Sequence, residues 1–121
     1  MTDKSTIVKE FLTLVASGYV QEWFDRYVHD DFIHHNQYFP GDRQSLLDAM
    51  RDAHRDHPNK SYVISQCIEQ WDRVMVYGKV EKELMNIAVV HICKVVDWKI
   101  EEMRDVWVVI DPDSPNMNWM F

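Results

Sequence analysis

Residues 88–110, AVVHICKVVDWKIEEMRDVWVVI, contain two apolar segments on either side of a short polar stretch, VDWK. Val, Ile and Trp are frequent in both segments, and β-branched and aromatic residues favour strands. A short polar break between two such segments indicates a turn. The stretch therefore predicts a β-hairpin made of two long strands.

The same strand-like composition begins at Ser61, and two further polar breaks, QWDR and EKELMN, divide it. Residues 61–110 thus predict four strands of roughly ten residues each, longer than the usual five or six. Because these strands follow one another directly, we expect an antiparallel meander.

The N-terminal half has a different periodicity. Apolar residues recur at spacings of three and four over 7–15, 20–28 and 46–53, which indicates three helices. Ser5 and Asp42 are candidate N-caps of the first and third helix. Three N-terminal helices and four consecutive strands predict an α+β fold in which the helices pack on one face of a curved, mainly antiparallel sheet, with a ligand pocket between the layers.

Composition limits the classes of function. The chain has 121 residues, of which 46% are hydrophobic, and we expect a single domain over residues 1–121. A net charge of −7 without a Lys/Arg cluster argues against nucleic acid and membrane surfaces as partners. Cys67 and Cys93 form no CxxC pair and no secretory leader is visible, so we expect a cytoplasmic protein with reduced thiols.

Two polar residues interrupt the last two predicted strands, His91 and Asp105. A turn with three loop residues would place them on the same face, whereas a two-residue turn would set His91 opposite Arg104. Trp98 is a poor residue for the positive φ of a tight turn, so the sequence leaves the register open. A buried Asp is costly unless it is paired or used in chemistry, and the alternative for each of the two residues is a purely structural role with its hydrogen bonds satisfied.

A second polar group lies in FIHHNQYFPGD, residues 32–42. Adjacent residues of an extended segment point in opposite directions, so only one of His34 and His35 can face a shared pocket. His54 and His57 have a spacing compatible with a metal, but no carboxylate or Cys/His set accompanies them. We therefore predict no metal site.

Four segments together resemble the SnoaL-like family of the nuclear transport factor 2-like superfamily, most clearly over residues 27–121. YVHDDFIHHNQ is similar to the family's Tyr-Val-x-Asp-Asp-Tyr-Ile-Gln-His-Asn-Pro, and NKSYVISQCIEQWDRVMVYGKV resembles its first two long strands. AVVHICKVVDWKIEEMRDV resembles a segment that ends in Gly-Lys-Ile-x-Glu-His-Trp-Asp, and NMNWMF resembles an Asn-Gly-Met-Phe tail. The resemblance implies a cone of three helices against a highly curved sheet.

The resemblance also implies a site. His35 and Asn36 would face the ligand, and His91 and Asp105 would reproduce the catalytic histidine and aspartate of the family's polyketide cyclases. Met103 replaces a family histidine, Arg104 replaces a tryptophan, and Trp98 replaces the glycine of the hairpin. The predicted ligand-binding residues are His35, Asn36, Met103, Trp107, Trp23 and Tyr27, although the aromatic stripe of the second helix is also typical of a core.

The leading hypothesis is an acid–base enzyme of the cyclase or isomerase type that works without cofactor on a small apolar, polyketide-like carbonyl compound. Asp105 would take a proton α to the carbonyl, and His91, Asn36 and His35 would hydrogen-bond the enolate oxygen. The alternative is a non-catalytic ligand-binding or dimerisation module, and an epoxide-type hydrolase is third. Both faces of the last two predicted strands carry apolar residues, which predicts a homodimer through the outer face of the sheet.

Overall fold

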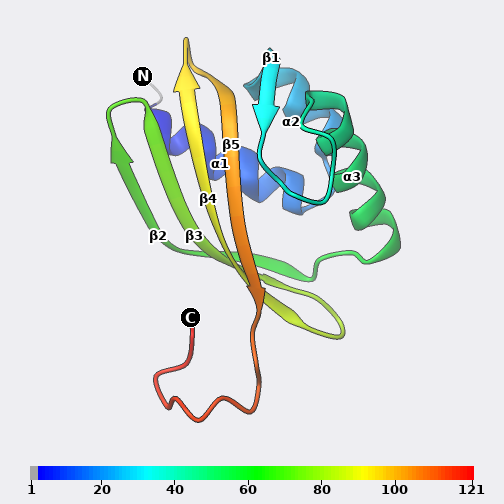
Figure 1. Cartoon of the computed structure of the whole chain (residues 1–121), viewed down its shortest axis with the longest axis vertical. Helices are drawn as coiled ribbons and strands as arrows, with labels where there is room; N and C mark the ends of the chain where they lie inside the picture. Colours follow the sequence, from blue (N-terminus) through cyan, green and yellow to red (C-terminus); the bar gives the residue numbers. More distant parts are fainter. Residues whose placement is uncertain (1–2) are drawn as a thin grey trace.

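The computed structural model describes residues 3–121 and confirms an α+β architecture (Figure 1). Within these residues the elements are, in chain order, α1 (Lys4–Ala16), α2 (Val20–Tyr27), β1 (Val28–His34), α3 (Arg43–Asp56), β2 (Ser61–Gln70), β3 (Arg73–Glu81), β4 (Asn86–Val96) and β5 (Lys99–Val109). None of these helices is long and apolar enough to span a membrane.

The sheet has five strands in the order β1-β5-β4-β3-β2. The four long strands form the predicted antiparallel meander, and β1 runs parallel to β5 at the edge. The prediction of four strands preceded by all three helices is therefore wrong, because β1 precedes α3. Asp30 and Asp31 interrupt the apolar pattern of β1, and its pairing with β5 is distant in sequence, so local periodicity did not reveal this strand.

Aspartate side chains fix the start of two helices. Asp3 accepts a hydrogen bond from the Thr6 N–H at 2.7 Å, and Asp42 accepts one from the Ser45 N–H at 2.9 Å. The predicted cap at Asp42 is confirmed, whereas Ser5 lies inside the first turn of α1 and is not its cap.

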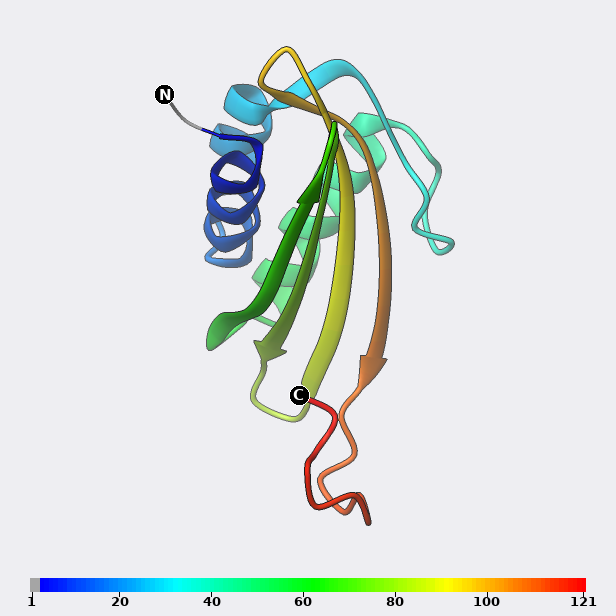
Figure 2. The same cartoon turned by 90° about the vertical axis from the view of Figure 1, so that its left-hand side faces the viewer.

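The helices lie on one side of the sheet, and within residues 3–121 no helix covers the opposite face (Figure 2). Each helix contributes a fully buried side chain to the core: Phe11 from α1, Phe24 from α2 and Leu47 from α3. Val76 of β3 and Ile100 of β5 meet them from the sheet. This helix-covered face is the one on which the predicted site residue His91 lies.

A β-bulge in the last hairpin sets the register of the predicted catalytic pair. The turn has two residues, Asp97 and Trp98, with φ of 51° and 63°, so Trp98 does adopt the positive φ for which it is poorly suited. Such a turn alone would set His91 opposite Arg104. Pairing shifts by one residue between Val95 and Lys94, because Glu101 is an extra residue on β5, and His91 therefore faces Asp105.

The sheet face without helices carries apolar side chains. Val106 and Val108 of β5 are 68% and 44% exposed. The segment after β5 returns to this face at β3, where the Tyr77 hydroxyl donates to the Met120 carbonyl at 2.7 Å and the Tyr77 and Phe121 rings lie 5.3 Å apart. The C-terminal segment thus contacts the β3 side of this face and leaves these two β5 valines exposed.

Candidate functional site

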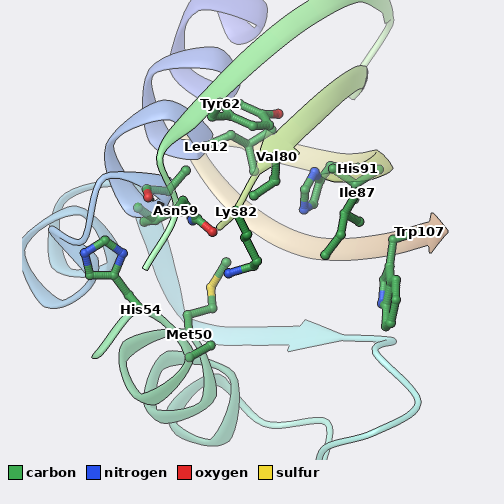
Figure 3. Close-up of a pocket in the computed structure, with 14 residues that line it drawn as sticks. Leu12, Met50, His54, Asn59, Tyr62, Val80, Lys82, Ile87, His91 and Trp107 are labelled. Atoms are coloured by element: carbon green, nitrogen blue, oxygen red, sulfur yellow. Dashed lines mark hydrogen bonds between the residues drawn. The ribbon is translucent and has the colours of Figure 1, made fainter. Parts of the chain in front are cut away.

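A cavity of about 220 Å³ lies between the helices and the sheet (Figure 3). Leu12 of α1 and Met50 of α3 line it from the helix side, and Val80, Val89 and His91 line it from the sheet. Its volume is below the roughly 300–1,000 Å³ that is common for drug-sized ligands, so the cavity suits a small, mostly apolar molecule.

His91 is the histidine on the sheet side of this cavity. Burial lowers the pKa of His91 to about 4, although the Asp105 carboxylate opposite it acts to raise that pKa. The imidazole is therefore neutral near pH 7. Its Nδ1 is buried and has no hydrogen-bond partner within residues 3–121. A neutral imidazole with an unused nitrogen can hydrogen-bond a ligand in the cavity.

Asp105 lies beside His91 but faces a different hollow. The Asn36 side-chain amide donates to the Asp105 carboxylate at 3.0 Å. Both residues line an open groove along the part of β5 that follows its pairing with β1. Trp107 lines this groove and also the cavity that contains His91. The His91–Asp105 pair therefore lies where the two hollows adjoin, with Trp107 next to it.

Three more buried polar atoms around the cavity lack a hydrogen-bond partner among the described residues: His54 Nδ1, Asn59 Oδ1 and the Tyr62 hydroxyl. Buried polar groups in proteins are almost always hydrogen-bonded, and an unpartnered one costs about 1–3 kcal/mol. Burial also raises the pKa of Tyr62, so its hydroxyl stays protonated and can donate. Together with His91, these atoms give an apolar cavity several unused hydrogen-bonding groups.

The two adjacent histidines point in opposite directions, as their extended backbone requires. His34 is buried, its Nε2 donates to the Pro40 carbonyl at 2.6 Å, and its Nδ1 accepts from the Asn36 N–H at 3.1 Å. His35 borders the groove of Asp105, but its Nε2 donates to Glu102 at 2.6 Å. That hydrogen bond is the main reason why the pKa of Glu102 lies below its usual value. His34 is thus a satisfied structural residue, and His35 is bound to Glu102.

The remaining predicted ligand-binding residues do not border the cavity or the groove. Met103 is 4% exposed and belongs to the core. Trp23 and Tyr27 stack on one face of α2 with ring centroids 5.4 Å apart, and the Tyr27 hydroxyl donates to Glu10 at 2.6 Å. The structure therefore brings Asn36, Asp105, His91 and Trp107 together. It places Met103, Trp23 and Tyr27 elsewhere.

Sequence reasoning missed several residues that line the cavity, among them His54, Asn59, Tyr62 and Lys82. His54 was detectable, because it continues the spacing of Leu47 and Met50 along the apolar face of α3. Asn59 and Lys82 lie in connecting segments, whose path the periodicity of the sequence does not determine. No group of three or more metal-binding side chains occurs within residues 3–121.

No protein-family model matches the chain, and neither does the sequence of any curated protein. Solved structures do match it. IdmH from Streptomyces antibioticus, described as a candidate polyketide cyclase, superposes with a TM-score of 0.74 at 12% identity over 88% of this chain and 92% of IdmH. An NTF2-like protein of unknown function from Cytophaga hutchinsonii superposes with a TM-score of 0.72 at 11% identity, over 89% of this chain and 92% of that one. The chain has the nuclear transport factor 2-like fold.

A third structure with the nuclear transport factor 2-like fold is a candidate ketosteroid isomerase from Kribbella flavida, with a TM-score of 0.71 at 13% identity over 93% of this chain and 83% of that one. Identities this low establish the fold alone. The superfamily resemblance of the sequence motifs is therefore confirmed as a shared fold, and the chemistry has to be argued from the residues of this chain.

Proposed function

We propose that this protein is a cofactor-independent acid–base enzyme of the cyclase or isomerase type, acting on a small apolar carbonyl compound bound in the cavity. The observation that carries the proposal is the pairing of His91 with Asp105 across β4 and β5, where the cavity adjoins the groove. Two proteins of the same fold are described as candidates for a polyketide cyclase and a ketosteroid isomerase, which is compatible with this class of reaction.

The environments of the two residues favour different roles. His91, whose pKa is about 4, is a weak base and remains neutral, so it suits hydrogen bonding to the carbonyl oxygen. Asp105 is held in place by the Asn36 amide and suits removal of a proton from the carbon next to the carbonyl. His35 takes no part in this scheme, because its imidazole is bound to Glu102.

The proposed reaction begins when a C–H bond next to the substrate carbonyl breaks and its proton passes to Asp105. The electron pair forms an enolate, whose oxygen accepts a hydrogen bond from His91. The enolate carbon then attacks a second carbonyl of the same molecule, which gives ring closure, or it is reprotonated at another position, which gives isomerisation. Either outcome returns the proton from Asp105, so no redox partner is needed.

The first half of this reaction can be measured without knowing the natural substrate. We expect the protein to accelerate exchange of the α-protons of a small ketone, such as cyclohexanone, for deuterium in D₂O, followed by NMR. Asp105→Asn should lower the exchange rate by about 10²–10⁴-fold, because the amide is nearly isosteric but cannot accept the proton. Glu102→Gln is the matched control and should leave the rate unchanged. A rate for Asp105→Asn equal to that of the parent would exclude Asp105 as the base.

One observation favours the alternative of a non-catalytic binding module. Asp105 borders the groove and is not among the residues that line the cavity, whereas His91 is. In a binding module, ketones would shift the NMR signals of cavity residues while α-proton exchange stayed at the rate of buffer. That combination of results would reject the enzyme and retain a ligand-binding protein.

A further inference from the structure

Lys82 is the one charged residue, histidines aside, among the described residues that line the cavity. It follows β3 directly and borders both the cavity and an outer hollow formed by the α3–β2 connection and the β3–β4 turn. Figure 3 shows the Lys82 side chain reaching into the space between α3 and the sheet. Ala53, Asn59 and Ile87 border the same two hollows, so these four residues form the cavity mouth, and Lys82 is the charged one among them.

No carboxylate forms an ion pair with Lys82 within residues 3–121, although other lysines such as Lys79 and Lys94 do have such partners. Its Nζ donates to the His57 carbonyl at 2.6 Å, which leaves two of the three ammonium N–H groups unused. Burial lowers the pKa of Lys82, and no neighbouring acid counters this effect. A half-buried ammonium without a counter-ion at an apolar cavity is suited to an anionic ligand group.

The acidic residues of the outer hollow do not fill this role. Asp56 and Glu83 line the outer hollow and not the cavity. Asp56 accepts a hydrogen bond from Arg55 at 2.9 Å, and Glu83 is exposed. The protein as a whole has a net charge of −7, so its overall field repels anions, and binding of an anion depends on a local cation such as Lys82.

We propose that the cavity binds a small apolar carboxylic acid as its anion, with the carboxylate on Lys82 at the mouth and the apolar body extending past Met50 toward His91. This inference rests on the proposed function and narrows its substrate class to an oxo acid, that is, a carboxylic acid that also carries the reacting carbonyl. Lys82 then fixes which end of the substrate reaches His91 and Asp105. In this scheme Lys82 determines specificity and takes no part in proton transfer.

Hexanoate and hexanamide are suitable probes, because they have similar size and differ in charge. Titrations followed by NMR at pH 7 should show that the parent protein binds hexanoate about 10- to 100-fold more tightly than hexanamide, as expected for charge-assisted hydrogen bonds. Lys82→Met should remove this preference, because hexanoate loses a charge-assisted hydrogen bond whereas hexanamide loses at most a weaker one from a neutral acceptor. Lys60→Met is the matched control, because Lys60 borders only the outer hollow, and it should keep the preference.

Equal affinities for the two probes in the parent protein, or binding of neither, would overturn the inference without any variant being needed. A preference for hexanoate that persists in Lys82→Met, or in Lys82→Gln if the first variant does not fold, would also overturn it. The titrations separate this inference from the proposed function. An acid preference that depends on Lys82, in a protein that does not exchange ketone α-protons, would retain the anion site and reject the enzyme.

Discussion

The half-buried imidazole of His91 predicts a loss of stability in mild acid. Burial depresses the pKa of this residue from 6.5 to about 4 in the folded protein, whereas the unfolded chain keeps the ordinary value. Above pH 6.5 the residue is neutral in both states and has no effect. As the pH falls from 6.5 toward 4, the unfolded state binds a proton that the folded state does not, and the free energy of unfolding decreases.

The size of this loss of stability follows from the shift in the pKa of His91. One pKa unit corresponds to about 1.4 kcal/mol, so the complete shift amounts to about 3 kcal/mol, of which about 2 kcal/mol is lost by pH 5. Domains of this kind have total stabilities of roughly 5–15 kcal/mol, so the loss is easily measured. The negative charge of Asp105 already opposes the shift, and its effect is included in the pKa of about 4.

Urea unfolding of the parent protein and of His91→Gln, at about pH 7.5 and pH 5, isolates this contribution. We expect the parent to lose about 2 kcal/mol more than His91→Gln between the two pH values, because glutamine does not titrate. His57→Gln is the control and should behave like the parent, since His57 is exposed at the end of α3. An identical pH dependence for the parent and His91→Gln would refute the argument that the folded protein holds His91 as a neutral imidazole.

Two further predictions concern the last hairpin. Trp98→Gly should raise the free energy of unfolding by about 1 kcal/mol in urea titrations, because glycine adopts the φ of 63° without strain and Trp98 is 52% exposed; a less stable variant would contradict this. We also propose that the apolar outer face forms a homodimer, so Val108→Lys should convert a dimer into a monomer in light scattering at micromolar concentration. A monomeric parent, or a variant of unchanged mass, would count against that interface.

The parts of the fold that follow from local sequence were predictable. The three helices appear in the apolar periodicity, and the side chain of Asp42 marks the start of α3. The strand β1 was not predictable from such patterns, because Asp30 and Asp31 occupy its centre and its partner β5 lies far along the chain. Its stabilisation comes from a contact that forms only once the chain has folded.

The register between β4 and β5 leaves a signal in the sequence, but this signal was not recognised in the sequence analysis. In a regular strand, residues on one face recur at every second position, whereas Ile100 and Met103 are both buried at a spacing of three. This spacing of three results from the extra residue Glu101, which also places Asp105 opposite His91. The alternation of β4 alone could not show this, because a bulge on one strand changes the pairing without changing the pattern of its partner.

The cavity itself depends on features that the sequence does not display. Its lining joins α1, α3, the α3–β2 connection and the four strands β2, β3, β4 and β5, and the closeness of these segments follows from the curvature of the sheet (Figure 2). Gly78 illustrates this dependence, because a Cβ at that position would come within 2.8 Å of the Tyr62 ring. The position of Tyr62 in the cavity wall therefore requires the absence of a side chain on the neighbouring strand.

The energetic cost of the cavity supports a functional role for it. His91, His54, Asn59 and Tyr62 each keep a buried polar atom without a partner in the part of the chain that the structure describes, and each such atom costs about 1–3 kcal/mol. Apolar residues of similar size at these positions would avoid that cost and fill the space. A ligand that supplies the missing hydrogen bonds would recover part of the cost on binding. The same polar atoms that weaken the free protein are therefore those expected to select its ligand.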